Sequence, residues 1–356
     1  MTDRWECGSS FPLILPTGGT PTPLPEHRLY GSGRQALRAL IEHGRREYGW
    51  TLLHVPAYYC PEVVESVVDL LPLRRYDATP VGPPPPPPPT RPGEVLLTVS
   101  YFGQAPTMPT TPAHVIVDAT HDPVAEWAGG ADFVFASLRK TLPLPDGGIV
   151  WSPTGRPLPP AAPPDPEHLA TAGRALTAMA LKSAYLAGES VDKSRYLELF
   201  GTAETGLRSR TVSDISDYSR EALRVLPMAE LRRRRTRNGA RLATRLVGLP
   251  GVSVHAHTFG VLLEFTRPEP RDRVRHGLIQ RDIYPAMLWT LPPETTPPRL
   301  LDLSRRLLYL HTDVRWSDED MDRAAAALRE LCRPPGEHAP SAPRPIAART
   351  PAPARS

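Results

Sequence analysis

Residues 132 to 148 read Asp132-Phe-Val-Phe-Ala-Ser-Leu-Arg-Lys140-Thr-Leu-Pro-Leu-Pro-Asp-Gly-Gly148. The apolar run at the start of this stretch is typical of a strand covered on both faces. Lys140 follows that strand closely, so its amine is expected at a sheet edge, where it can form an imine with a carbonyl compound. Ser137, three residues earlier, can donate a hydrogen bond to a phosphate group. Without support from residues elsewhere, the same stretch could be an ordinary surface loop.

Lysine is scarce in this chain. Of the 42 lysine and arginine residues, only Lys140, Lys182 and Lys193 are lysines. Together with 46 prolines, the excess of arginine indicates the codon bias of a GC-rich genome rather than selection for a polyanion. The arginine run between Leu231 and Arg245 is interpreted as a solvated helix face, so no nucleic-acid partner is expected. Chemistry that needs a side-chain amine has only three candidates.

The cysteines and the hydropathy of the chain indicate the cellular compartment in which the protein is expected. Neither the odd number nor the spacing of Cys7, Cys60 and Cys332 suggests a disulfide framework or a zinc site, which favours a reducing, cytoplasmic setting. The N-terminus lacks a secretion signal, and no apolar run approaches the roughly 20 residues that a membrane span needs. His255 and His257 share one face of a predicted strand but have no third ligand nearby, so no metal is expected.

The order of the predicted elements indicates an α/β domain. Short apolar runs without alternation suit the buried strands of a mostly parallel sheet; they are Leu52 to Val55, Val95 to Ser100, His114 to Asp118, Asp132 to Ala136 and Gly148 to Trp151. After Pro166 helical patterns dominate, with further strands at Val252 to His255, Gly260 to Phe265 and Leu307 to His311. We predict a large domain over 27–190, and a helical linker with a smaller C-terminal α+β domain over 191–332.

Three segments are predicted to lie outside these domains. Residues 1–26 are rich in proline, glycine and threonine without an apolar period, and residues 333–356 are similar, so both are expected to be extended or disordered. Seven consecutive prolines, Pro83 to Pro89, lie within an insertion at 83–92. Because proline cannot enter a helix or a central strand, this insertion is expected to form a polyproline II segment at the surface.

Asp118 ends one of the buried strands, in Val115-Ile-Val-Asp118-Ala-Thr-His121. A carboxylate at the carboxyl end of a buried strand lies where α/β sheets place ligand groups. Such an acid has a specific use with pyridoxal phosphate (PLP), because a carboxylate paired with the pyridine nitrogen keeps that nitrogen protonated and lets the ring accept electrons. Taken alone, Asp118 is as well explained as a loop or helix cap, and His121 as a structural hydrogen-bonding residue.

Two glycines open the first predicted helix, in Tyr30-Gly-Ser-Gly-Arg-Gln-Ala36. The pattern fits the G-x-G-x-x-A fingerprint of dinucleotide-binding proteins, but Pro23 and Pro25 precede it and no acid ends the following strand. The glycines still permit close approach to the backbone amides of a helix N-terminus, which is a natural phosphate site. A plain N-cap turn is the alternative.

Five segments occur in the order seen in fold-type-I PLP enzymes: Ser32-Gly-Arg-Gln-Ala-Leu37, Pro56-Ala-Tyr-Tyr-Cys60, Ser100-Tyr-Phe-Gly103, Asp118-Ala-Thr-His121 and Ser137-Leu-Arg-Lys140. The set most resembles the DegT/DnrJ/StrS aminotransferases. The similarity continues through Ile215-Ser-Asp-Tyr-Ser219, Arg234-Arg-Thr-Arg-Asn238, Leu308-Tyr-Leu-His311 and Ser317-Asp-Glu-Asp-Met321, and it covers roughly residues 30 to 331. The order of the motifs, rather than any one of them, carries the resemblance.

The resemblance implies how these residues would hold the cofactor. Lys140 is implied to be the Schiff-base lysine and Asp118 the partner of the pyridine nitrogen. The phosphate cradle is implied to consist of Gly33, Arg34 and Ser137.

Two further positions are implied to lie against the cofactor ring. His121 matches the polar residue that follows the aspartate in this family and is expected near the ring oxygen. The aromatic side chain that stacks on the ring is expected from Tyr58 or Tyr59, with Tyr59 preferred, although the stacking position could equally align with Cys60.

The resemblance also implies a reaction. It is the transfer of an amino group from an amino-acid donor to a keto or aldehyde small molecule, such as a sugar, a cyclitol or a specialised-metabolite intermediate, in a homodimer. Arg139 and Arg315 are candidate holders of a substrate carboxylate. Another PLP reaction on the same scaffold (racemisation, elimination or carbon–carbon cleavage) is an alternative, as is a non-catalytic protein that kept the fold.

Overall fold

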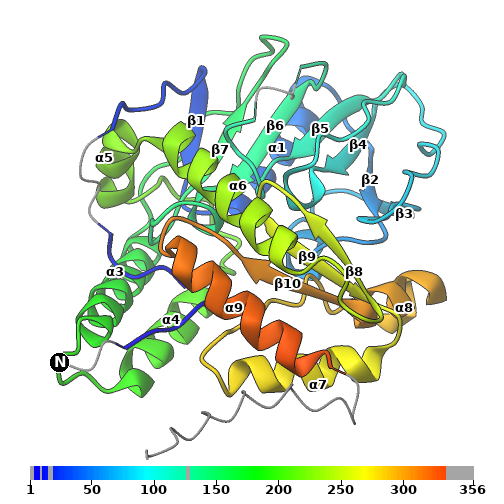
Figure 1. Ribbon diagram of the computed structural model, residues 1–356. Coiled ribbons are helices and arrows are strands. Elements are labelled where there is room, and N and C mark those ends of the chain that lie inside the picture. Colours follow the sequence, from blue (N-terminus) through cyan, green and yellow to red (C-terminus); the bar gives the residue numbers. More distant parts are fainter. Residues whose placement is uncertain (1–3, 9, 15–18, 126–128, 334–356) are drawn as a thin grey trace, which may run out of the picture.

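The computed structural model describes residues 4–8, 10–14, 19–125 and 129–333 of the 356-residue chain. These residues form a seven-stranded sheet and a separate three-stranded sheet, each covered by helices (Figure 1). Of the predicted C-terminal tail, residues 334–356 lie outside the described residues. Within the described ranges, no helix is long and apolar enough to cross a membrane.

The larger sheet is mixed but mostly parallel. Its strand order is β1 (His27–Tyr30), β7 (Gly148–Trp151), β6 (Phe133–Ser137), β5 (His114–Asp118), β4 (Glu94–Val99), β2 (Leu52–Pro56) and β3 (Leu73–Tyr76). Strands β3, β2, β4, β5 and β6 pair in parallel, whereas β7 pairs antiparallel with both β6 and β1. The inner strands are buried on both faces, which is why their apolar runs are continuous. The predicted α/β architecture with a mostly parallel sheet is confirmed.

Helix α1 (Gly33–Glu47) packs against β6 and β7 and points its N-terminus toward the carboxyl ends of the parallel strands. The Ser32 side chain caps this helix by accepting a hydrogen bond from the Gln35 amide. Helix α2 (Pro61–Glu65) is short, and the helices α3 (Pro166–Leu186) and α4 (Lys193–Gly206) pack closely against each other. Helix α5 (Asp217–Val225) follows them. Residues of α1, α2 and α4 therefore come together at the carboxyl ends of the parallel strands.

The C-terminal part contains a smaller antiparallel sheet. Its strand order is β10 (Leu307–His311), β9 (Gly260–Phe265) and β8 (Val252–Ala256). The helices of this part are α6 (Met228–Arg245), α7 (Pro268–Ile279), α8 (Pro298–Arg306) and α9 (Asp318–Leu331). Figure 1 shows α6 and α9 side by side over this sheet, where their apolar residues share a core with β9 and β10. A capping box between Ser317 and Asp320 starts α9.

Two elements escaped the sequence analysis. Strand β1 was missed because its side chains are mostly half-exposed, as an edge strand permits, and because prolines precede it. Helix α8 was missed because it is short and begins at Pro298. Helix α2 ends at Glu65, and turns follow it. The proline run joins β3 to β4 without helix or strand, and its side chains are largely exposed.

The described part of the N-terminal segment packs against the rest of the molecule. Cys7 and Phe11 are buried, and a β-bridge joins Cys7 to Ile283. The buried carboxylate of Glu6 forms ion pairs with Lys182 at 2.7 Å and Lys193 at 2.8 Å. Residues 4–8 therefore connect the α3–α4 pair to the C-terminal part, although this segment was expected to be an extended or disordered arm.

Candidate active site

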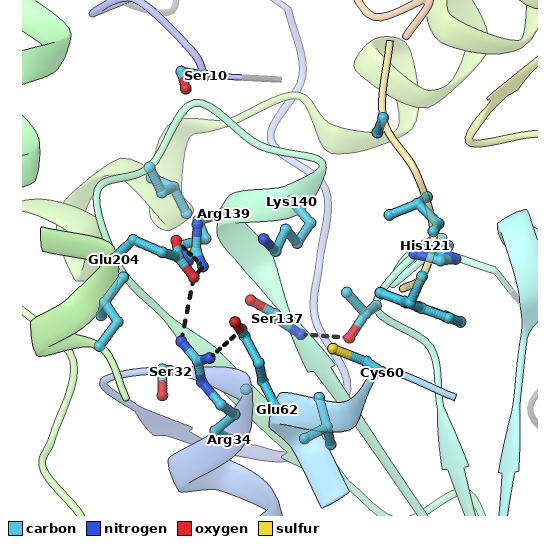
Figure 2. Close-up of a pocket in the computed structure, with 18 of the residues that line it drawn as sticks. Ser10, Ser32, Arg34, Cys60, Glu62, His121, Ser137, Arg139, Lys140 and Glu204 are labelled. Atoms are coloured by element: carbon cyan, nitrogen blue, oxygen red, sulfur yellow. Dashed lines mark hydrogen bonds and ion pairs between the residues drawn. The ribbon is translucent and has the colours of Figure 1, made fainter. Parts of the chain in front are cut away.

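A cavity of about 770 Å³ opens at the carboxyl ends of β4, β5 and β6. Its walls come from the N-terminal segment, α1, α2, the loops after β5 and β6, α3, α4, and the C-terminal part. This is where open α/β sheets place their ligands. Of the predicted site residues, the cavity brings together Lys140, Asp118, His121, Ser137, Gly33 and Arg34. Figure 2 shows several of these side chains converging on one space.

Lys140 ends the 3-10 helix η3 (Leu138–Lys140), which follows β6 directly. Its side chain is exposed to the cavity but enclosed by the cavity walls. No described residue forms a hydrogen bond or ion pair with its Nζ atom. The positive charge of Arg139, together with burial, lowers the pKa of Lys140 to about 8. A primary amine in this state is well suited to attack a carbonyl carbon.

Asp118 ends β5 and is buried at the floor of the cavity. Its Oδ2 atom accepts a hydrogen bond from the Tyr59 hydroxyl at 2.5 Å, and its Oδ1 atom accepts one from the Thr120 amide at 2.8 Å. Burial raises the pKa of Asp118, and these two hydrogen bonds oppose the rise. The carboxylate is thus held in a fixed orientation by groups behind it.

The N-terminus of α1 lies against the start of η3. Gly33 is packed so closely that a Cβ atom at this position would lie 2.8 Å from the Ser137 Cβ. Gly148 is equally confined, since its Cβ would lie 2.1 Å from the Ser32 carbonyl oxygen. Ser32, Gly33, Arg34 and Ser137 all line the cavity. The exposed amides of a helix N-terminus beside two serines form an arrangement suited to an anion such as phosphate.

A chain of ion pairs borders this anion-binding arrangement. Arg34 pairs with Glu62 at 2.8 Å and with Glu204 of α4 at 3.4 Å, and Glu204 also pairs with Arg139 at 2.7 Å. Although burial raises the pKa of Glu204, the positive charges of Arg139, Lys140 and Arg34 lower it to about 2. Glu204 is therefore ionised and holds both guanidinium groups in place (Figure 2).

His121 lies in an aromatic wall on the other side of the cavity. Its ring is parallel to Phe259 at a centroid distance of 4.3 Å and to Trp289 at 5.9 Å. Its Nδ1 atom accepts a hydrogen bond from the Phe102 amide, so the neutral ring carries its proton on Nε2. Burial, with the nearby charge of Lys140, lowers the pKa of His121 to about 3. His121 is thus a neutral hydrogen-bond donor.

The structure places Tyr59 and Tyr58 differently from the expected stacking position. Neither tyrosine lines the cavity. Tyr59 is buried with its hydroxyl on Asp118, and Tyr58 donates to the Leu288 carbonyl oxygen at 2.6 Å. The residue of this segment that does face the cavity is Cys60. Tyr59 is therefore placed to orient the carboxylate rather than to cover a ring, because its phenol is committed to that hydrogen bond.

Arg315 is not placed to hold a substrate carboxylate. Its guanidinium group pairs with Asp313 at 2.7 Å and donates to the carbonyl oxygens of Gly8 and Ser10. It also lies over the Phe11 ring, 4.3 Å from the ring centroid. Because Ser10 and Phe11 line the cavity, Arg315 instead holds the N-terminal segment against it. Arg139 does line the cavity, but its charge is shared with Glu204.

Four residues that line the cavity were not expected there from the sequence: Glu204, Glu62, Phe11 and Trp289. Glu204 lies in the last turn of a helix, and Phe11 lies in a segment without any periodic signal. A usable signal was present only for Glu62, which follows Cys60 by two residues in a segment already matched to the family. The other three reach the cavity through tertiary packing.

Solved aminotransferases share this fold. DesI, solved in the presence of its TDP-sugar product, matches with a TM-score of 0.54 and 18% identity over 87% of this chain and 81% of its own. Spr1654 from Streptococcus pneumoniae, provisionally named a sugar aminotransferase and solved in its PLP-form, matches with a TM-score of 0.60 and 12% identity over 92% and 99% of the two chains.

A third match is the aminotransferase TlmJ from Streptoalloteichus hindustanus, with a TM-score of 0.54 and 13% identity over 86% of this chain and 85% of its own. No family model and no curated protein sequence matches this chain. At these identities the likeness is one of fold. The chain is built on the architecture of these aminotransferases over nearly its whole described length.

Proposed function

We propose that this protein is a PLP-dependent aminotransferase. It transfers an amino group from an amino-acid donor to a keto or aldehyde small molecule, a sugar, a cyclitol or a specialised-metabolite intermediate. The observation that carries the proposal is the meeting of Lys140 and Asp118 in one cavity beside the N-terminus of α1. The shared fold with DesI and Spr1654 supports the sugar class of acceptor, and the ordered motifs support the DegT/DnrJ/StrS family.

The residues present fit pyridoxal phosphate. The glycine at position 33 keeps α1 close to Ser137, so that both the helix amides and the two serine side chains are available to a phosphate group. The Lys140 amine has no partner among the described residues. The Asp118 carboxylate accepts hydrogen bonds from Tyr59 and Thr120 and lines the same cavity. These are the three groups that the cofactor requires of a protein of this fold: an amine, an acid and an anion site.

When bound, pyridoxal phosphate supplies an electron sink that stabilises negative charge at the substrate Cα atom. Asp118 would hold the proton on the pyridine nitrogen, and Ser32, Gly33, Arg34 and Ser137 would hold the phosphate. Lys140 would first bind the cofactor and then, once released, move a proton between the substrate Cα and the cofactor C4′ atom as general base and acid. His121 would donate a hydrogen bond from its Nε2–H group to the ring oxygen.

The proposal includes a homodimer located in the cytoplasm. The resemblance to enzymes that build their active sites across a subunit interface supports the dimer. The small-molecule donor and acceptor would be its reaction partners, with no nucleic acid, membrane or metal involved.

Absorbance spectroscopy and product analysis test the proposed function. Protein loaded with pyridoxal phosphate should show the absorbance band of the lysine-bound cofactor, which Lys140→Ala should lack and the control Lys193→Gln should keep. A panel of amino donors should then yield the aminated cofactor and the matching keto acid. A band that persists in Lys140→Ala would refute the cofactor assignment. A normal band with no keto acid from any donor would refute transamination and favour another PLP reaction.

A further inference from the structure

Arg139 has no role in the proposed cofactor contacts, yet it stands directly beside Lys140 in η3. Its guanidinium group is held by Glu204 at 2.7 Å, and Glu204 is held in turn by Arg34. The side chains of Arg34 and Arg139 are only 10% and 18% exposed, so this arrangement is not a loose surface pair. Figure 2 shows the amine end of Lys140 pointing toward Arg139 and Glu204.

We propose that Arg139, fixed by Glu204, is a positioning residue for Lys140: its adjacent positive charge enlarges the share of the lysine amine that is neutral and can attack a carbonyl carbon. The proposal deepens the proposed function, because it explains how the cofactor lysine is made ready before the cofactor arrives. It concerns the cofactor-free chain and can be tested there.

The charges around Lys140 support this role. The titratable and charged groups that act on Lys140, or on which it acts, are Arg139, Glu204, Cys60, Arg34, His121 and His311. Arg139 makes the largest contribution, and burial and Arg34 act in the same direction, whereas Glu204 and Cys60 oppose them. His121 and His311 are neutral, because burial lowers the pKa of His121 to about 3 and that of His311 to about 4.

The consequence for reactivity is large. At pH 7.5, an amine with a pKa of about 8 is neutral in about one molecule in four, whereas an amine at the ordinary value of 10.5 is neutral in about one in a thousand. The free-base fraction of Lys140 at pH 7.5 is thus on the order of 200 times that of an unperturbed lysine, and only this fraction reacts with an electrophile that requires the free base. The same free base is needed for attack on the aldehyde carbon of pyridoxal phosphate, where the new C–N bond forms and the aldehyde oxygen leaves as water.

Competitive acetylation of the full chain, freed of cofactor, tests the proposal. The lysine nitrogen attacks one carbonyl carbon of acetic anhydride, acetate leaves, and the ammonium proton passes to water. Peptide mass spectrometry follows each lysine across pH. The chain supplies its own references, because its only other lysines, Lys182 and Lys193, are paired with Glu6.

We expect Arg139→Gln to raise the pH midpoint of Lys140 acetylation by one unit or more, which lowers the neutral fraction of the amine at pH 7.5 by at least about eightfold. The matched control is Arg208→Gln, which removes an arginine that pairs with Glu62 and does not line the cavity. It should leave the midpoint unchanged. The acetylation rates of Lys182 and Lys193 should stay the same in both variants, which shows that the fold is kept.

An unchanged midpoint in Arg139→Gln would overturn the proposal, and so would an equal shift in Arg208→Gln. If Lys182 becomes reactive in Arg139→Gln, the chain has opened, and Arg139→Met, which keeps an unbranched stem, takes its place with the same two criteria. The result does not depend on catalysis. Loss of the cofactor band in the loaded protein would overturn the proposed function alone, and an unshifted acetylation midpoint would overturn the role of Arg139 alone.

Discussion

Replacing Glu6 by glutamine should lower the free energy of unfolding, because the ion pairs that hold the N-terminal segment against the rest of the protein are lost. The Glu6 side chain is 4% exposed, and its two oxygens neutralise Lys182, itself 6% exposed, and Lys193. Glutamine keeps the shape but not the charge, so Lys182 would be left as a buried ammonium without a counter-charge. Removing one partner of a buried ion pair costs about 3–5 kcal/mol, and we expect a loss of that size for Glu6→Gln.

Urea denaturation followed by far-UV circular dichroism measures this loss. The matched control is Glu330→Gln, because Glu330 pairs with Arg281 at 2.8 Å but is 59% exposed, and an exposed pair contributes only about 0–1 kcal/mol. The midpoint should fall in Glu6→Gln without a change of slope. If the two variants unfold within about 1 kcal/mol of each other, the buried cluster is not what fastens the segment, and the reasoning fails.

The effect should also depend on pH. Burial raises the pKa of Glu6, but Lys182 and Lys193 outweigh burial and lower it below the ordinary value of 4.5. A carboxylate whose folded pKa is lowered stabilises the protein above its unfolded pKa and loses that contribution as the pH falls through the folded value. The difference in stability between wild type and Glu6→Gln should therefore be full at pH 7 and shrink below pH 4.5.

Four further variants have expected outcomes. Gly148→Ala should destabilise the protein by at least about 2 kcal/mol in the same urea assay, because its Cβ would lie 2.1 Å from the Ser32 carbonyl oxygen. Gly173→Ala, in an open part of α3, should stabilise it by about 0.5–1 kcal/mol, and the reverse order would refute the packing argument. Asp118→Asn should slow the donor half-reaction by at least about 100-fold while the cofactor stays bound; a normal rate, measured by keto-acid formation, would contradict the role of Asp118. Phe11→Ala should raise the half-saturating substrate concentration by about tenfold with little change in the limiting rate, since a buried ring is removed from the cavity wall; an unaltered concentration would exclude Phe11 from substrate contact.

Much of the larger sheet could be predicted from the sequence, because its strands are buried on both faces. The predicted bounds of the strands ending at Asp118 and Trp151 are those observed. A parallel sheet also sends its strand ends to one edge, so the positions of Asp118 and Lys140 after buried strands were enough to expect both in the same cavity. Strand β1 lacks such a pattern because it is an edge strand.

The rest of the cavity could not be predicted, because long-range packing builds it. Glu204 reaches the ion-pair chain only because α4 packs against α3 beside the sheet. Tyr59 and Cys60 are neighbours, but the Tyr59 side chain contacts Asp118 whereas Cys60 lines the cavity, and the sequence does not show which of the two does which. Arg315 is committed to the carbonyl oxygens of a segment more than 300 residues earlier in the chain. None of these partners leaves a periodic or local signal in the sequence.

The contact between Arg315 and the N-terminal segment has a consequence for synthesis on the ribosome. When translation has passed α5, the nascent chain already carries Lys140, Asp118 and the helix terminus at Gly33. It does not yet carry β10, which brings His311 to the cavity, or Arg315, which holds Ser10 and Phe11 against it. Because domains fold as units during synthesis, the half of the cavity that would hold the cofactor can form first. The other half of the cavity is completed only when β10 and the residues after it have been synthesised and Arg315 has bound the N-terminal segment.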